Sequence, residues 1–323
     1  MKPAVFVHSW VPEPILADLE RRFEVDHVDV FKTGVLPPDE FARHAKGKQG
    51  LMVLTAPVPG ELLKASAGTL KVVAAVAVGV DNIDVAAATA AGIQVTNTPG
   101  VLTDAVADMS IAMVLALGRR LVEADRYTRA GKFGGSSFPL FWGATVVGET
   151  LGIIGMGRIG QAVARRARGF GLKLVYHNRN RVDQAIEAEL GATWLPLEGL
   201  LAAARYVLLL TPLSDQTRHL INAQRLKAMR KDAFLINVSR GPVVHEAALL
   251  DALKQGAIAG AALDVYEFEP EITPGLAELD NVVLTPHIAS GTVETRHAMV
   301  RVAAENLIAC LSGAPAPNPV NRV

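Results

Sequence analysis

The chain has 323 residues; half are apolar, a fifth are charged, and 32 basic side chains (Lys and Arg) balance 32 acidic ones. This length is enough for two globular domains rather than one. The balanced charge, without a long basic run or an aromatic-rich basic stretch, argues against nucleic acid or an acidic membrane surface as a partner.

The first part of the chain alternates short apolar runs with longer helical patterns. The runs at 4–7, 51–54, 72–76 and 93–95 are typical of buried strands. The alternation predicts a parallel sheet covered by helices. One long helix is expected at 103–130, ended by Gly131, with a Gly/Pro/Ser loop at 131–139 as a candidate exposed arm.

A second series of the same kind begins near residue 150. Its apolar runs are nearly continuous, as expected for parallel strands buried on both faces. A helix at 290–311 and an irregular Pro-rich tail complete the chain. The predicted strands of this series are 150–155, 172–177, 206–211, 233–239, 260–265 and 282–286.

Cysteine content and hydropathy narrow the class of protein further. The single cysteine, Cys310, excludes an intrachain disulfide and a cysteine-based zinc site, and its apolar helical surroundings favour a packing role over a reactive thiol. We expect no bound metal. No apolar stretch is long enough to span a bilayer and no signal-peptide core is recognisable, so we expect a cytoplasmic protein.

A glycine-rich turn follows the predicted strand at 150–155. The segment GIIGMGRIG contains Gly155, Gly157 and Gly160, and an amphipathic helix follows it. In that context the first glycine permits a tight turn, the second lets the backbone approach a pyrophosphate, and the third lets helix and strand pack closely. The free N–H groups of the helix N-terminus bind phosphates. The turn therefore predicts dinucleotide binding, rather than glycines used for packing alone.

The segment LVYHNRNR at 174–181 lacks the acid that NAD-binding units place at the end of their second strand. Asn178, Arg179 and Arg181 stand there instead. An acid would repel the 2′-phosphate of NADP, whereas guanidinium groups pair well with phosphate. We therefore expect NADPH as the preferred cofactor, with NADH possible. The alternative is that both arginines are solvated loop residues.

Three further side chains follow late strands. Arg240, Glu269 and His287 are far apart in sequence, but ligands of open parallel sheets bind beyond the strand ends where all three would lie. A carboxylate can hold a histidine in one tautomer and keep it charged near neutral pH. An arginine can grip a substrate carboxylate with two hydrogen bonds. Taken singly, each could be an ordinary loop residue; together they suit hydride transfer to a 2-oxo acid.

Seven segments together make the chain similar to a known family over nearly its whole length. It resembles the D-isomer-specific 2-hydroxyacid dehydrogenases, and within them the glyoxylate/hydroxypyruvate reductase branch. The segments are AVGVDNIDV (77–85), NTPGVLTDAVADMSIAMVLALGRR (97–120), LGIIGMGRIG (151–160), TPLSDQTRHLIN (211–222), INVSRGPVVHEAAL (236–249), ALDVYEFEP (262–270) and LTPHIAS (284–290).

The resemblance implies roles for individual residues. His287 would protonate the carbonyl oxygen of the substrate, with Glu269 as its partner, and Arg240 would bind the carboxylate. The backbone at Val78 and Gly79 would hold the same carboxylate from the other domain. Glu267 is a rival to Glu269, but its offset from Asp264 is wrong for the family pattern. Further positions assigned to the cofactor are Thr103, Arg158, Ile159, Thr211, Pro212, Val238 and Asp264.

The resemblance also implies the domain arrangement. A Rossmann dinucleotide-binding domain at 99–289 would be inserted in a flavodoxin-like substrate domain made of 1–98 and 290–323, giving an α/β fold with two doubly wound parallel sheets. The helix at 101–130 and the loop after it resemble the arm of a homodimer, on which Phe141 and Trp142 would contact the partner or pack locally. Trp10, at the end of the first strand, is a weaker candidate for the border of the substrate pocket.

The expected reaction is NADPH-dependent reduction of small 2-oxo acids, glyoxylate and hydroxypyruvate first. Two alternatives stay open. The same motifs fit a 2-ketogluconate reductase, which would differ only in pocket size. The fold also fits a non-catalytic nucleotide-sensing protein of the corepressor kind. A phosphoglycerate dehydrogenase is disfavoured because no additional basic group for a substrate phosphate is recognisable.

Overall fold

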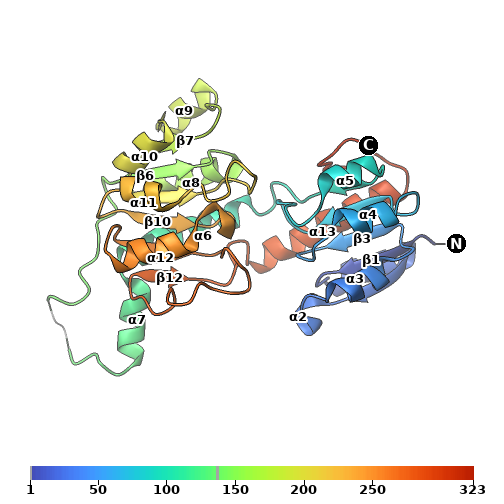
Figure 1. Cartoon of the computed structure of the whole chain (residues 1–323), viewed down its shortest axis with the longest axis horizontal. Coiled ribbons are helices and arrows are strands. Elements are labelled where there is room, and N and C mark those ends of the chain that lie inside the picture. The colour runs from blue at the N-terminus through green and yellow to red at the C-terminus, as the bar shows by residue number, and fades with distance from the viewer. Residues whose placement is uncertain (1, 136–137) are drawn as a thin grey trace. The chain divides into compact units, whose positions relative to one another are not determined.

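The chain divides into two compact units, each built on its own sheet (Figure 1). The computed structural model describes residues 2–135 and 138–323, so Ser136 and Ser137 of the predicted loop at 131–139 lie outside the described residues. Unit 1 comprises Met1–Leu102 and Gly291–Val323, and unit 2 comprises Thr103–Ser290. Both sheets pair in parallel, which confirms the predicted α/β class.

Unit 1 contains a five-stranded sheet in the order β2-β1-β3-β4-β5. Helix α13 packs against β3 and β4 of this sheet. The strands are β1 (Ala4–His8), β2 (Glu24–Val28), β3 (Gly50–Val53), β4 (Val72–Ala75) and β5 (Gln94–Thr96), and the helices are α1 (Glu13–Arg22), α2 (Val30–Thr33), α3 (Pro38–Ala45), α4 (Gly60–Ala65), α5 (Val85–Ala90) and α13 (Val293–Leu311). The sequence analysis missed β2 because an edge strand is only partly buried, so EVDHV lacks an apolar run.

Unit 2 contains a seven-stranded sheet in the order β12-β11-β10-β9-β6-β7-β8. Its strands are β6 (Thr150–Ile154), β7 (Lys173–His177), β8 (Ala192–Trp194), β9 (Tyr206–Leu209), β10 (Phe234–Asn237), β11 (Gly260–Leu263) and β12 (Val282–Leu284). Its helices are α6 (Thr103–Gly118), α7 (Leu121–Arg129), α8 (Arg158–Gly169), α9 (Gln184–Leu190), α10 (Leu197–Ala203), α11 (Ala223–Ala228) and α12 (Glu246–Lys254), with a 3₁₀ turn at Gly241–Val243. The chain runs outward from β6 through β7 and then returns to β9, so the switch point of this sheet lies between β6 and β9.

The single helix predicted at 103–130 is wrong: the segment forms two helices. The carbonyl of Gly118 accepts a hydrogen bond from the Ala144 N–H at 2.6 Å. Arg120 then adopts a left-handed conformation with a φ of 53°, which a continuous α-helix cannot contain. The sequence analysis missed the break because apolar residues such as Leu121 and Val122 continue beyond it, although α7 has no buried residue.

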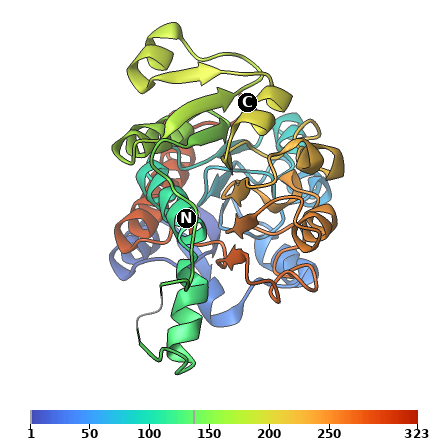
Figure 2. The same cartoon turned by 90° about the vertical axis from the view of Figure 1, so that its left-hand side faces the viewer.

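Helix α7 projects from the rest of unit 2 (Figure 2). Phe141 packs edge-on against Tyr127 and beneath the guanidinium of Arg120, whereas the Trp142 side chain is exposed. The contribution of this segment to a homodimer stays a prediction. In the described part of the chain, none of the helices combines the length and apolarity that crossing a membrane requires. Burial raises the pKa of the Cys310 thiol, in keeping with a packing role.

Candidate active site

Arg240, Glu269 and His287 follow three neighbouring strands at one edge of the unit 2 sheet. Arg240 comes three residues after β10, Glu269 six after β11 and His287 three after β12, and these strands pair side by side in parallel. The carboxyl ends of parallel strands meet at one edge, so the topology brings three distant segments of sequence to one place.

The imidazole of His287 donates from Nδ1 to the Oε2 of Glu269 at 2.9 Å. The other carboxylate oxygen of Glu269 accepts from the Tyr266 N–H, also at 2.9 Å. Both side chains of the pair remain partly open to solvent, at 46% for His287 and 35% for Glu269. The Nδ1 of His287 is therefore occupied, and its Nε2 is the nitrogen left for a substrate.

Burial alone would raise the pKa of Glu269, because a carboxylate loses hydration there. The hydrogen bond and charge of His287, the Tyr266 N–H and the guanidinium of Arg240 oppose this effect and hold the pKa below its ordinary value of 4.5. Glu269 is thus ionised at neutral pH and can act as the acceptor that fixes the imidazole. The guanidinium of Arg240 therefore lies within electrostatic range of Glu269.

A buried carboxylate, Asp264, holds the loop that carries His287. Its two oxygens accept from the N–H groups of Ile288 and Ala289, each at 2.8 Å, and from the Thr285 hydroxyl at 2.6 Å. His287 itself donates its N–H to the Asp264 carbonyl at 2.8 Å. These bonds hold His287 in a left-handed conformation with a φ of 53°, which is unfavourable for a non-glycine residue. The predicted cofactor role of Asp264 remains a prediction, while the bonds show a role in placing the histidine.

Arg240 is held through its backbone and through its own guanidinium. The Asn237 side-chain amide donates to the Arg240 carbonyl at 3.0 Å, and the Nη1 of Arg240 donates to the Ser239 carbonyl at 2.8 Å. Asn237 also accepts from the N–H and the hydroxyl of Ser239. The turn is therefore a hydrogen-bonded unit, and Val238 within it is buried.

The second acid of the loop, Glu267, contacts a different histidine. Its Oε1 accepts from the Nε2 of His219 at 2.5 Å, while Glu269 contacts His287. The two acids therefore have separate partners, and the preference for Glu269 in the sequence analysis stays a prediction. The pairing of His219 was missed, because 48 residues separate it from Glu267 and no local spacing links them.

The glycine turn after β6 has the shape that a dinucleotide requires. Gly155 has a φ of 110°, and a Cβ there would lie 2.7 Å from the Leu210 carbonyl oxygen, so only glycine fits. A Cβ on Gly160 would press on the backbone of Gly155, whereas one on Gly157 would meet open space. An approaching pyrophosphate would occupy that space, in front of the N-terminus of α8 where Arg158 and Ile159 begin the helix.

Among the residues after β7, Asn178 supports the glycine turn, whereas Arg179 and Arg181 are exposed and contact other side chains. The Asn178 side chain accepts from the Met156 N–H within the glycine turn at 2.6 Å. Arg179 donates to the Gln216 side chain at 3.0 Å. Arg181 makes two hydrogen bonds to Glu187, at 3.1 and 2.7 Å, and lies over the Trp194 ring. The charge of Arg181, which was expected to face a 2′-phosphate, is therefore paired with Glu187, an acid that the sequence analysis did not consider.

Two other predicted cofactor residues lie at the same switch point. Thr211 and Pro212 follow β9, which is adjacent to β6. The Thr211 hydroxyl is buried and, among the described residues, has no hydrogen-bond partner. Thr103 is the first residue of α6. These residues and the glycine turn are therefore suited to binding a dinucleotide.

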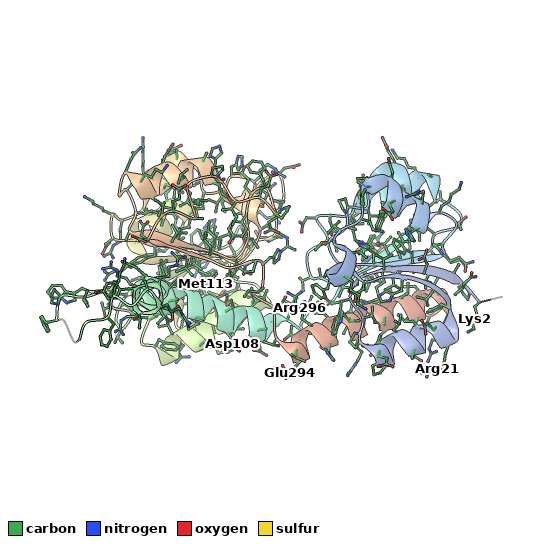
Figure 3. All side chains as sticks on the ribbon, turned by 90° about the horizontal axis from the view of Figure 1, so that it is seen from below. Lys2, Arg21, Asp108, Met113, Glu294 and Arg296 are labelled. Carbon is green, nitrogen blue, oxygen red and sulfur yellow. The ribbon has the colours of Figure 1, made fainter. Side chains whose placement is uncertain are left out.

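Unit 1 carries the remaining predicted residues. Val78 and Gly79 follow β4, and the Asn97 side chain donates to the Val78 carbonyl at 2.8 Å. Trp10 lines a cavity of about 310 Å³ at the carboxyl ends of β1, β3 and β4. Its ring lies 5.2 Å from that of His297, and Arg296 also lines the cavity. Figure 3 shows Arg296 near the start of α13.

Residues 111–289 match the family model of the NAD-binding domain of D-isomer-specific 2-hydroxyacid dehydrogenases. A glyoxylate reductase from Korarchaeum cryptofilum is 48% identical, with 100% of this chain and 97% of that protein covered. A glyoxylate reductase from Pyrococcus horikoshii is 45% identical at the same coverage.

A solved structure gives the same answer for the fold. An NADPH-dependent glyoxylate/hydroxypyruvate reductase from Sinorhizobium meliloti, in complex with NADP and malonate, superimposes with a TM-score of 0.87 at 36% identity, and both chains are fully covered. The match of the family model to more than half of the chain and the full-length similarity to these relatives lead to one conclusion. The chain belongs to the D-isomer-specific 2-hydroxyacid dehydrogenase family.

Proposed function

We propose that the protein reduces small 2-oxo acids, glyoxylate and hydroxypyruvate first, to 2-hydroxy acids with NADPH as the preferred hydride donor. The observation that carries the proposal is the His287–Glu269 pair, placed with Arg240 at the carboxyl edge of the unit 2 sheet. The relatives named glyoxylate reductase support this choice of substrate.

In the proposed reaction, Arg240 binds the carboxylate of the 2-oxo acid and draws electron density from the neighbouring carbonyl. A nicotinamide cofactor held at the glycine turn would supply the hydride that carbon 2 receives. His287 then gives the proton on its Nε2 to the carbonyl oxygen. The proton on its Nδ1 stays on that nitrogen and remains hydrogen-bonded to Glu269. One hydride and one proton are added, so the 2-oxo acid becomes a 2-hydroxy acid and the histidine is reprotonated from solvent.

The preference for NADPH rests on the end of β7. His177 and Asn178 stand where an acid would repel a 2′-phosphate, and Asn178 is hydrogen-bonded to the glycine turn. In the described part of the chain Arg179 has a neutral partner, Gln216, rather than a carboxylate. Arg179 is therefore the better-placed partner for the phosphate, and Arg181 must be shared with Glu187.

A substrate panel tests the proposal against its alternatives. Glyoxylate, hydroxypyruvate, pyruvate and 2-ketogluconate are each offered with NADPH and with NADH, and kcat/KM is measured for every pair. We expect the highest kcat/KM for glyoxylate or hydroxypyruvate with NADPH. The highest value for 2-ketogluconate would instead support the 2-ketoaldonate reductase. Cofactor binding without turnover of any 2-oxo acid would support the nucleotide-sensing alternative.

A further inference from the structure

The loop after β11 carries two acids, and each receives a histidine from another segment. Glu269 accepts from His287, and Glu267 accepts from His219 at 2.5 Å. Both histidines have left-handed backbones, with a φ of 53° for His287 and 51° for His219. The second pair is the more enclosed, because the Glu267 side chain is only 8% exposed. The reaction proposed above uses the first pair and gives the second no part.

Glu267 is fixed by a reciprocal pair of bonds to a buried acid, Glu246. The Glu267 carboxylate accepts from the Glu246 N–H at 2.9 Å, and the Glu246 carboxylate accepts from the Glu267 N–H at 2.6 Å. The second oxygen of Glu246, which is 1% exposed, accepts from the Thr273 hydroxyl at 2.6 Å. Every one of these bonds restricts the loop, so Glu267 offers His219 a fixed acceptor.

His219 also binds the turn that follows Arg240. Its N–H donates to the Pro242 carbonyl at 2.7 Å. On the other side of this turn, Gly241 lies so close to the Tyr266 carbonyl that no Cβ could be accommodated. The turn is therefore enclosed between the His219 segment and the loop at 266–267, and the His219–Glu267 bond joins these two sides directly.

We propose that His219, through its bond to Glu267, is a positioning residue for Arg240. The bond closes a clamp, made of His219, Glu267 and Glu246, over the turn that carries the arginine. When the clamp is closed, the Arg240 guanidinium is held in one orientation toward the substrate carboxylate. When the clamp is open, Gly241 and Pro242 can shift, and Arg240 moves with them. The inference rests on the proposed function, because it assigns the clamp to the residue that would bind the 2-oxo acid.

The test separates substrate binding from chemistry. In His219→Ala we expect the KM for glyoxylate to rise on the order of tenfold, because small misplacements of a binding group are costly, with a smaller change in kcat and none in the KM for NADPH. His219→Gln can still donate to Glu267 and should restore the KM to within about twofold of the wild type. Glu267→Ala should raise the KM as His219→Ala does, and the double variant should add little to either, as coupled residues do.

A matched control is the His44–Asp26 pair of unit 1. Its Nδ1–Oδ2 distance is 2.9 Å and both side chains are 30% exposed, so His44→Ala removes a similar bond far along the chain from Arg240. We expect His44→Ala to leave the KM for glyoxylate unchanged. If His219→Ala does not fold, Glu267→Asp keeps the charge, shortens its reach and should raise the same KM.

The Arg240→Lys variant distinguishes a failure of the clamp from a failure of the substrate-binding role of Arg240. A raised KM for glyoxylate in Arg240→Lys, with an unchanged KM in His219→Ala and Glu267→Asp, would overturn the clamp and leave the proposed function standing. An unchanged KM in Arg240→Lys would remove the substrate-binding role of Arg240, and with it the clamp. Absence of glyoxylate turnover in the wild type would instead overturn the proposed function. A lowered melting temperature in His219→Ala, with kcat reduced and KM unchanged, would mark a purely structural role and also overturn the clamp.

Discussion

Two ends of the unit 2 sheet can be compared: the edge beyond β10, β11 and β12, and the loop after β7. At the first, backbone groups take part in the bonds that place the side chains: the Tyr266 N–H donates to Glu269, and Asp264 accepts from the N–H groups of the two residues after His287. At the second, Arg179 and Arg181 are on a loop and their contacts are with other side chains, Gln216 and Glu187.

This contrast indicates which side-chain positions can be predicted from a sequence pattern. A side chain that is held by backbone bonds at a strand end depends on the topology, which apolar runs reveal. A surface arginine depends on whichever acid reaches it, and such pairs are weak and easily exchanged. We therefore expect substitutions at the first end to affect chemistry strongly, and substitutions at the second to shift the cofactor preference moderately.

The largest effect is expected for His287→Asn. Asparagine can still accept and donate hydrogen bonds but cannot deliver a proton, so kcat for glyoxylate should fall by about 10²–10⁴-fold. Steady-state kinetics measure this, and the melting temperature should stay close to that of the wild type. A variant that keeps more than about a tenth of the wild-type kcat would refute the assignment of the proton donor.

A moderate effect is expected at the adenosine end. Arg179→Ala should raise the KM for NADPH by about tenfold, since a hydrogen bond to a charged group is lost, while the KM for NADH stays nearly constant. Glu187→Gln removes the acid that pairs with Arg181 and should lower the KM for NADPH by a few-fold. Kinetics with both reduced cofactors measure the split. Equal changes with NADPH and NADH would refute the 2′-phosphate role of these arginines.

The smallest effect is expected in the acid stability of Glu269→Gln. The folded-state pKa of Glu269 lies below 4.5, so the ionised carboxylate stabilises the folded protein above that pH and the contribution is lost as the pH falls through the depressed value. We expect the melting temperature of the wild type to exceed that of the variant by only roughly 1–3 °C near neutral pH, because the pair is partly exposed. The difference should vanish on acidification. A difference that grows as the pH falls would have the wrong sign for this carboxylate.

Apolar runs and glycine spacing predicted most of the structure that positions the candidate site. They located the glycine turn at Gly155, the order of the βα units and the strand ends that carry Arg240 and His287. They failed at two kinds of place: at the edge strands β2 and β8, which have no buried run, and at Arg120, where a left-handed residue interrupts an apolar helical pattern. In both places the deciding contact is not local in sequence.

The fold class, the glycine turn and the three residues proposed for the chemistry can all be predicted from the amino-acid sequence, because apolar runs locate parallel strands and these residues follow the strand ends. Which acid is hydrogen-bonded to which histidine is visible only in the tertiary structure. Glu267 and Glu269 are two residues apart, yet one receives His219 and the other His287. The reason is geometric: the partners come from segments whose approach is set by packing, and no spacing along the chain records it.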